Sequence, residues 1–419
     1  MIEITRLDNG LRIITERMPH VRSASVGVWV ENGSRHEDVE INGISHFIEH
    51  AIFKGTSRRT ALQIAVESDR QGGNLNASTS QEMTCVYTRV LDRQLPLAID
   101  LITDMLTDAT FDRVEIERER SVILEEIKMV EDAPDELIHD LFAESYWPDQ
   151  AFGRPIAGTL ASVGSLTRDQ LFDFYRERYR PDRMVLAAAG NLEHAEVVAL
   201  AERSLGAIAP SSTPALDAAP AATPAFVVRQ KDGLEQAHML IGSPSPAAAS
   251  PDRYAVNLMS AILGDGMSSR LFQRIREERG LVYGIYSAVE SFLDTGVHTI
   301  SAGASPEHVP EVIDLVMAEL RLLKASGPTA DELQCAKEQY KVATVLSLES
   351  TFNRMSRLAR HELSFGRQIP VDEVLDRIDA VSATDIVRVA TEICRGDNLA
   401  LAVLGDVDGI HLDRAALSC

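Results

Sequence analysis

The chain has 419 residues, 45% of them hydrophobic, which is enough for two or more domains with large cores. Its formal net charge of −22 argues against a nucleic-acid-binding protein, because such proteins are normally basic. No apolar run approaches the roughly 20 residues of a membrane span, and the four cysteines show no paired spacing, so we expect a reduced, cytoplasmic compartment and no membrane partner.

The N-terminal residues predict a strand, a hairpin turn at Asn9–Gly10 and a second strand, with no signal-peptide core. The apolar run Ser25–Val30 predicts a buried strand that leads toward a helix beginning near Gly43. His36 and Glu37 precede that helix at no spacing typical of metal ligands. We therefore interpret both residues as structural.

The helix after Gly43 carries the pattern H-x-x-E-H at His46, Glu49 and His50. Residues four apart share a helix face, so the two imidazoles can bind one metal ion with Glu49 beside them. The alternative is a polar helix end with two solvated histidines. Apolar residues surround the three polar ones, which favours burial, and buried ionisable groups need a partner such as a metal ion. The pattern is the reversed zinc signature, in which two imidazoles bind zinc and the glutamate acts as a base.

A helix is expected over residues 60–71, followed by a glycine turn that runs into an alternating strand over 76–88. On its own this pattern indicates only an edge or hairpin strand. A further helix is expected over 95–106 and a strongly helical segment over 114–130.

The segment 114–130 contains the best candidate for a third metal ligand, which a zinc site requires. At about 100° per residue, one apolar stripe of this helix contains Glu119, Val122, Ile123, Glu126, Ile127 and Val130. Charged runs on helices are usually solvated, and that interpretation suits Glu125 and the other acidic residues of the segment. It fits Glu119 and Glu126 poorly, because their neighbours on the stripe are apolar.

The rest of the chain predicts two domains. A turn at 132–135, a helix at 168–179 and a buried strand at 181–191 complete a first domain, residues 1–207. Residues 208–224 are rich in alanine and proline, which is typical of a linker. The second domain, residues 225–419, repeats the first in outline, but its helix at 254–263 has no histidines where the first domain has its metal-binding pattern. A duplicated α+β domain accounts for this, each copy a mainly antiparallel sheet with packed helices.

The second domain still contains a notable segment. A glycine loop near Gly266 joins a basic helix that contains Arg276, stops at Gly280 and is followed by Tyr283. From composition alone, a capped amphipathic helix with Tyr283 in a core strand explains the segment equally well.

The H-x-x-E-H pattern, followed by Glu126 at 76 residues after His50, resembles that of the pitrilysin-type inverzincin metallopeptidases. The resemblance covers nearly the whole chain and is strongest to the shorter, mitochondrial-processing-peptidase-like bacterial members. It implies that His46, His50 and Glu126 bind one zinc ion per chain and that Glu49 is the general base. It also implies that Glu119 is a catalytic-site acid that supports the ligands.

The resemblance assigns further roles. The strand with Asn76, Ala77 and Thr79 borders the cleft, where a substrate peptide can pair with its backbone as an extra strand. Arg276 and Tyr283, in the spacing R-x6-Y, reach the substrate backbone and help to hold the carbonyl that is attacked.

We therefore expect a zinc endopeptidase that hydrolyses peptides or unfolded segments inside a clam-like chamber, through zinc-activated water with Glu49 as general base. The acidic charge is compatible with basic peptide substrates, but it is also a common solubility trait. One chain of this length forms half of the family's chamber, which implies a homodimer or a heterodimer with an inactive relative. The alternatives are a non-catalytic structural or chaperone-like subunit of such a heterodimer, and a metal-binding module without chemistry.

Overall fold

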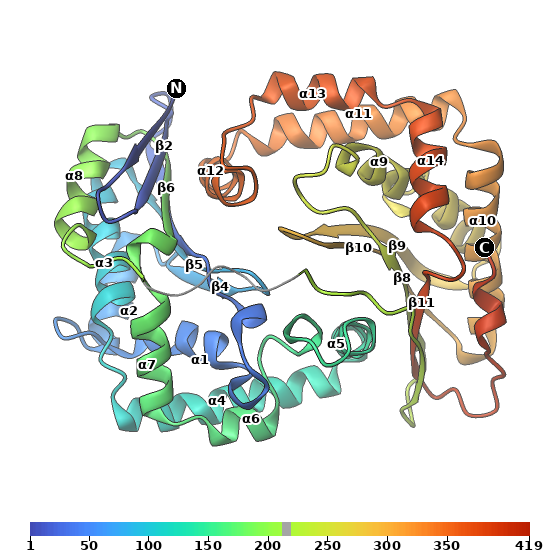
Figure 1. Cartoon of the computed structure of the whole chain (residues 1–419), viewed down its shortest axis with the longest axis horizontal. Coiled ribbons are helices and arrows are strands. Elements are labelled where there is room, and N and C mark those ends of the chain that lie inside the picture. Colours follow the sequence, from blue (N-terminus) through green and yellow to red (C-terminus); the bar gives the residue numbers. More distant parts are fainter. Residues whose placement is uncertain (212–218) are drawn as a thin grey trace. The chain divides into compact units, whose positions relative to one another are not determined.

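The computed structural model describes residues 1–211 and 219–419, which form two compact units (Figure 1). Of the described residues, the first unit contains 1–129, 154–211 and 346–368, and the second contains 130–153, 219–345 and 369–419. The units therefore exchange segments across the expected division into 1–207 and 225–419. Within the expected linker 208–224, residues 212–218 lie outside the described residues, and the adjoining stretches 209–211 and 219–224 contain no helix or strand.

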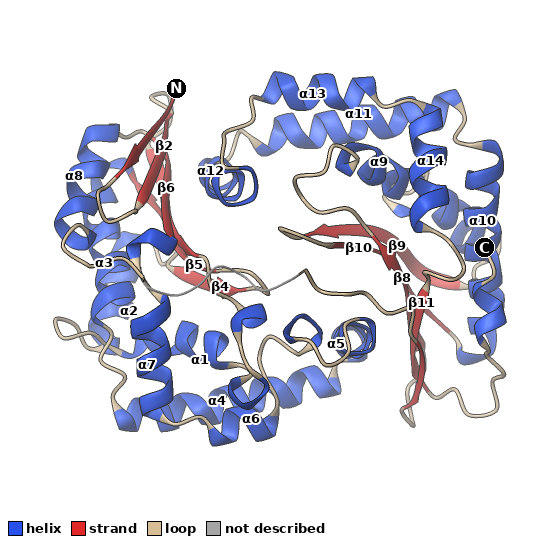
Figure 2. Cartoon of the chain, in the orientation of Figure 1, coloured by secondary structure: helices blue, strands red, loops and turns tan. Residues whose placement is uncertain are grey.

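The described part of the first unit is built on a six-stranded sheet in the order β1-β2-β6-β3-β5-β4 (Figure 2). Its strands are β1 (Ile2–Arg6), β2 (Arg12–Arg17), β3 (Ser23–Val30), β4 (Asn76–Thr79), β5 (Thr84–Leu91) and β6 (Met184–Gly190). Neighbouring strands are antiparallel except β2 and β6. The expected N-terminal hairpin and the buried strands are confirmed. The single strand expected over 76–88 is wrong, because the chain reverses at residues 80–83 and β4 pairs with β5.

The second unit repeats this topology in a five-stranded sheet with the order β7-β11-β8-β10-β9. Its strands are β7 (Phe226–Gln230), β8 (Ala237–Pro244), β9 (Val282–Ser291), β10 (Gly296–Ala304) and β11 (Ala400–Gly405). Only the pair β7–β11 is parallel among these described strands. The order β2-β6-β3-β5-β4 of the first sheet is thus reproduced strand for strand, so the expected duplicated α+β fold is confirmed.

Helices pack against both sheets (Figure 2). Those of the first unit are α1 (Ile44–Ala51), α2 (Ala61–Gln71), α3 (Leu95–Asp108), α4 (Arg113–Asp132), α6 (Leu160–Ser165), α7 (Arg168–Arg178), α8 (His194–Leu205) and α12 (Thr351–Phe365). Those of the second unit are α5 (Pro134–Tyr146), α9 (Arg253–Gly264), α10 (Val309–Ser326), α11 (Ala330–Ser347), α13 (Val371–Ala380) and α14 (Ala383–Ile393), and the last residues of α4 and α11 cross the boundaries between the units. Within the described chain, no helix combines the length and the apolarity that crossing a membrane would require.

Each sheet has one face covered by a helix from the other half of the sequence. Helix α12 packs Met355 and Leu358 against the face of the first sheet that contains the small residue Ala187 of β6. Helix α5 packs against β8 and β11 of the second sheet, where a Cβ on Gly242 would lie 2.1 Å from the ring of Phe142. Both helices approach their sheets closely because small residues leave room for them.

Helix α4 buries a narrower stripe than its sequence predicts. Ile116, Glu119, Ile123 and Ile127 are buried, in the spacing of a helix face. The expected burial of Val122 is wrong, because its side chain is 52% exposed at the margin of that face. The stripe therefore holds α4 against the core of the first unit and still includes the carboxylate of Glu119.

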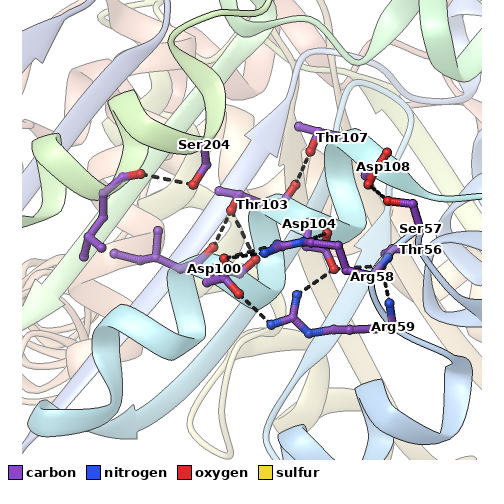
Figure 3. Close-up of polar contacts among 12 residues, drawn as sticks. Thr56, Ser57, Arg58, Arg59, Asp100, Thr103, Asp104, Thr107, Asp108 and Ser204 are labelled. Atoms are coloured by element: carbon purple, nitrogen blue, oxygen red, sulfur yellow. Dashed lines mark hydrogen bonds and ion pairs between the residues drawn. The ribbon is translucent and has the colours of Figure 1, made fainter.

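An ion-pair network ties the segment after α1 to helix α3 (Figure 3). The buried carboxylate of Asp104 accepts hydrogen bonds from the hydroxyl of Thr56 at 2.8 Å, Nε of Arg58 at 2.7 Å and Nη1 of Arg59 at 2.7 Å. Burial alone would raise the pKa of Asp100, but hydrogen bonds from Arg59 and Arg58 outweigh it and lower that pKa. The ionised Asp100 therefore contributes its full stabilising free energy above its unfolded-state pKa of about 4. This contribution is lost as the pH falls through the lowered pKa of the folded state.

Replacing Asp104 by alanine should destabilise the first unit by about 3–5 kcal/mol, because two guanidinium groups lose a buried carboxylate. The measurement is the free energy of unfolding from urea denaturation of the purified chain.

The matched control is Asp108→Ala, on the same helix one turn away. Asp108 is exposed and contacts only the hydroxyl of Ser57 in this network, so its loss should cost less than about 1 kcal/mol. Equal effects of the two substitutions would contradict a structural role for the buried carboxylate.

Candidate metal centre

Helix α1 carries the H-x-x-E-H pattern, and its N-cap residue is Gly43, which has φ 92°. A Cβ at this position would lie 2.7 Å from the carbonyl oxygen of Ala157, so both the backbone conformation and the close contact require glycine. Ile44, Phe47 and Ile48 of the helix are buried in the core. The polar residues of the pattern lie on the remaining face.

That face brings together His46, His50 and Glu126, one potential ligand atom from each lying within 4.8 Å of the others. Nε2 of His46 lies 3.8 Å from the Glu126 carboxylate, and Nε2 of His50 lies 3.6 Å from it. The histidine side chains are only 12% and 22% exposed, so the alternative of two solvated histidines is wrong. Two imidazoles and a carboxylate at this separation fit a divalent metal ion such as zinc.

Glu119 lies behind His50 and fixes the orientation of its ring. Its carboxylate accepts a hydrogen bond from Nδ1 of His50 at 2.8 Å and forms an ion pair with Lys54 at 2.6 Å. Burial would raise the pKa of Glu119, but these two partners lower it, so the carboxylate is charged. With Nδ1 engaged, His50 presents Nε2 toward Glu126, as metal-binding histidines usually do.

Glu49 lies beside the cluster and contacts the edge of the sheet. Burial raises the pKa of its carboxyl group, although hydrogen bonds from the hydroxyl and the backbone amide of Thr79 oppose the rise. Its Oε2 atom is buried and has no hydrogen-bond partner among the described residues. A carboxylate with a raised pKa and one unsatisfied oxygen is suited to accept a proton from a molecule bound at the cluster.

Glu37 caps the N-terminus of α1. Its buried carboxylate accepts hydrogen bonds from the backbone amide of Gly43 at 2.7 Å, the backbone amide of Ser45 at 2.9 Å and the side chain of Asn42 at 3.2 Å. Burial nevertheless raises the pKa of Glu37. His36 lies outside the cluster, where its ring contacts Gly33 and burial lowers its pKa to about 4.

The loop before α1 is also joined to the hairpin formed by β4 and β5. Arg35 and Glu82 form an ion pair in which both side chains are less than one-tenth exposed. Gly33 lies so close to the hairpin that a Cβ would be 2.2 Å from the carbonyl oxygen of Ser80. These contacts hold the hairpin, and therefore Thr79, at a fixed position relative to α1.

The expected substrate strand is confirmed as an edge strand, since β4 is the last strand of the first sheet. Ala77 of β4 faces the core shared with α1, and Thr79 contacts Glu49. Asn76 lies on the opposite face, where its side chain contacts the hydroxyl of Tyr87 at 3.4 Å. The strand thus extends from the metal-ligating cluster along an unpaired edge.

Arg276 and Tyr283 contact each other in the second unit. The guanidinium of Arg276 lies 5.4 Å from the ring centre of Tyr283 and 4.6 Å from that of Phe272. The expected basic helix is a short π-helical segment, η7 (Phe272–Glu277). Placement of Tyr283 in a core strand is wrong, because it lies near the start of the edge strand β9 with 80% of its side chain exposed.

Comparison with known proteins adds to this geometry. A family profile described as insulinase, peptidase family M16, matches residues 12–160, and one described as the peptidase M16 inactive domain matches residues 165–340. An uncharacterised zinc protease of Streptomyces coelicolor is 42% identical over 408 residues, covering 96% of this chain and 89% of that protein. The chain belongs to peptidase family M16.

Two further similar proteins agree with this chain in length or in fold. An uncharacterised zinc protease of Bacillus subtilis is 39% identical over 404 residues, covering 96% of this chain and 98% of that protein. The crystal structure of a protease from Helicobacter pylori has a TM-score of 0.90 at 22% identity, covering 96% of this chain and 99% of that one. The fold shared with that protease therefore extends over 96% of this chain.

Sequence reasoning missed one residue near this site. Lys54 follows His50 by one helical turn, and this spacing could have predicted its contact with Glu119. The interpretation of Glu37 as structural is confirmed by its capping contact with α1, although the sequence did not predict the contact itself. The position of Glu37 before a glycine that begins a helix is a weak sign of a capping carboxylate, because the capping contact spans six residues of irregular chain.

Replacing Glu126 by glutamine should lower the affinity for zinc by at least about 100-fold. Loss of a residue that only hydrogen-bonds to a metal ligand already lowers metal affinity about 10–100-fold, and loss of a ligand should cost more. Affinity is measured by competition with a chromogenic chelator. Glu125→Gln is the matched control, since that neighbour is exposed and pairs with Lys128. Equal zinc affinity in the two variants would remove Glu126 from the ligand set.

Replacing Glu37 by alanine should destabilise the chain by about 2–4 kcal/mol, since it leaves two buried amides of α1 without an acceptor. The readout is the urea denaturation midpoint, with exposed Glu40→Ala as the control. Unchanged stability of Glu37→Ala would show that water replaces the cap.

Proposed function

We propose that the chain is a zinc-dependent endopeptidase that hydrolyses peptides or unfolded segments. The observation that carries this proposal is the convergence of His46, His50 and Glu126, with the Glu49 carboxyl group beside them. The names of the M16 relatives from Streptomyces coelicolor and Bacillus subtilis, both zinc proteases, support it. One zinc ion per chain is expected, since the described residues contain one such group of ligands.

The residues of the candidate metal centre have separate roles in the proposed reaction. His46, His50 and Glu126 would hold the ion, which supplies a Lewis acid that polarises the peptide carbonyl and makes water more acidic. Glu119 keeps the ring of His50 in the tautomer that leaves Nε2 free. Glu49 accepts the proton of the attacking water as the new C–O bond forms, and it then returns this proton to the amine nitrogen, which leaves as the peptide C–N bond breaks.

Substrate binding would use backbone pairing. The free edge of β4 can accept an extended peptide as a further strand, which selects for unfolded segments more than for particular side chains. The exposed hydroxyl of Tyr283 and the guanidinium of Arg276 are donors suited to a peptide carbonyl or the developing oxyanion. We infer that they act on a substrate in a chamber completed by a second chain, either identical or an inactive relative.

Two further properties follow from the same proposal. Cys85 and Cys394 are buried free thiols, which suits a reducing compartment such as the cytoplasm. Among peptide substrates, basic ones are favoured by the net charge of −22.

A second candidate function is a non-catalytic structural or chaperone-like subunit. The description of one matching family profile as the M16 inactive domain favours this alternative. The half-buried charged ligands around α1 favour the enzyme, because a scaffold gains nothing from desolvating them.

Replacing Glu49 by glutamine should lower cleavage of a quenched peptide by about 10²–10⁴-fold while zinc content stays at the wild-type value, because glutamine cannot accept the proton. Cleavage is measured by fluorescence and zinc by elemental analysis of the same samples.

A second experiment removes the metal with a chelator. Removal of the metal should abolish cleavage by the wild type, and added zinc should restore it. Cleavage that survives in Glu49→Gln would refute the assigned base, whereas a zinc-loaded wild type that cleaves no peptide would favour the structural subunit.

A further inference from the structure

A pocket of about 440 Å³ lies beside the beginning of β4, within the first unit. Its wall includes Asn76 of β4, Tyr87 and Arg89 of β5, and Ser350 and Phe352 at the start of α12. The rings of Tyr87 and Phe352 are 4.9 Å apart, so they form one continuous aromatic surface. The pocket therefore opens on the face of the sheet that α12 covers.

The register of the hairpin places successive β4 side chains on opposite faces. Asn76 pairs with Tyr87, and its side chain lies on the pocket face. Ala77 belongs to the core on the other face, and Thr79 on that same face contacts Glu49. One strand thus leads from the proposed base to the pocket in three residues.

The outer edge of β4 can accept a partner strand, because β4 is the last strand of the first sheet. The amide of Ala77 donates to the side chain of its own neighbour Asn76 at 2.9 Å, so this amide does not pair with β5. A peptide that pairs antiparallel at Ala77 would place its next residue opposite Asn76. The side chain of that residue would lie over the pocket, because cross-strand neighbours share a face.

The direction of the strand fixes which part of the substrate reaches the pocket. Since β4 runs from Asn76 toward Glu49, an antiparallel peptide runs from Glu49 toward Asn76. The residue over the pocket therefore lies on the C-terminal side of the bond attacked near Glu49, about two or three residues beyond it at roughly 3.3 Å per residue.

Arg89 determines the chemistry that the pocket favours. Its side chain is exposed, and no carboxylate of the described chain forms an ion pair with it, although Glu349 lines the adjoining hollow. Its planar fork matches a carboxylate, and the hydroxyl of Ser350 supplies a further polar group.

We propose that this pocket is a specificity subsite for an aspartate or glutamate side chain of the substrate, two or three residues after the bond that is cleaved, with Arg89 as its anion-binding residue. The inference rests on the proposed peptidase function and adds a position-specific acidic preference to the general binding of extended peptides.

The test uses extended peptides that differ only in one residue, Asp, Asn or Lys, placed at each position after the cleaved bond. Wild-type protein should show a kcat/KM about tenfold higher for Asp than for Asn at the second or third position, the usual gain from one charge-assisted contact. Arg89→Gln should bring this ratio to about one, and Arg89→Glu should favour Lys. Arg93→Gln is the matched control, because Arg93 is an exposed arginine near β5 outside the pocket.

A binding arm separates this inference from the peptidase proposal. Fluorescent versions of the same peptides are titrated against Glu49→Gln with and without Arg89→Gln. An Asp preference that disappears with Arg89 supports the subsite in either arm. Cleavage or binding without such a preference, or a preference that survives Arg89→Gln, overturns it. A wild type that cleaves no peptide refutes the peptidase proposal by itself, and the binding ratios still decide the subsite.

Discussion

Desolvation of the polar face of α1 is the constraint on which the first unit depends. A helix of eight residues carries His46, Glu49 and His50 in positions that are mostly withdrawn from water. Each ionisable group removed from water costs several kcal/mol unless it finds a partner. The partners come from segments far apart in sequence: Glu119 and Glu126 from α4, and Thr79 from β4. The fold is therefore arranged so that a helix, an edge strand and a capped loop meet at one point.

The two sheets show how one topology supports two different tasks. They share the order of five strands and the single parallel pair. Helix α9 follows β8 as α1 follows β3, yet its buried face has no histidine and no charged residue. The edge strands differ as well, since β4 is bordered by Glu49, whereas β9 exposes Tyr283. Chemistry in this chain thus resides in side chains added to a common framework, as it does in most widely used folds.

Sequence patterns predicted the parts of the site that depend on local periodicity. The spacing of His46 and His50 predicted their shared helix face, and the stripe on α4 predicted that Glu119 and Glu126 lie on one face, where Glu119 is buried and the side chain of Glu126 is 44% exposed. The patterns failed where tertiary contacts decide. Nothing in the periodicity of α5 or α12 indicates which sheet each helix covers. The capping contact of Glu37 also depends on the path of an irregular loop, which local propensity does not encode.

The exchange of α5 and α12 affects how the chain can be made. The face of the first sheet that contains Trp29 and Val185 stays apolar and uncovered until Met355 and Leu358 have left the ribosome, long after the sheet's last strand has been synthesised. The nascent first unit is thus an aggregation-prone intermediate that depends on late-synthesised residues for completion. A break in the chain between the two halves would leave fragments that each lack one helix of their own unit. Each half therefore needs a helix from the other half to complete its fold.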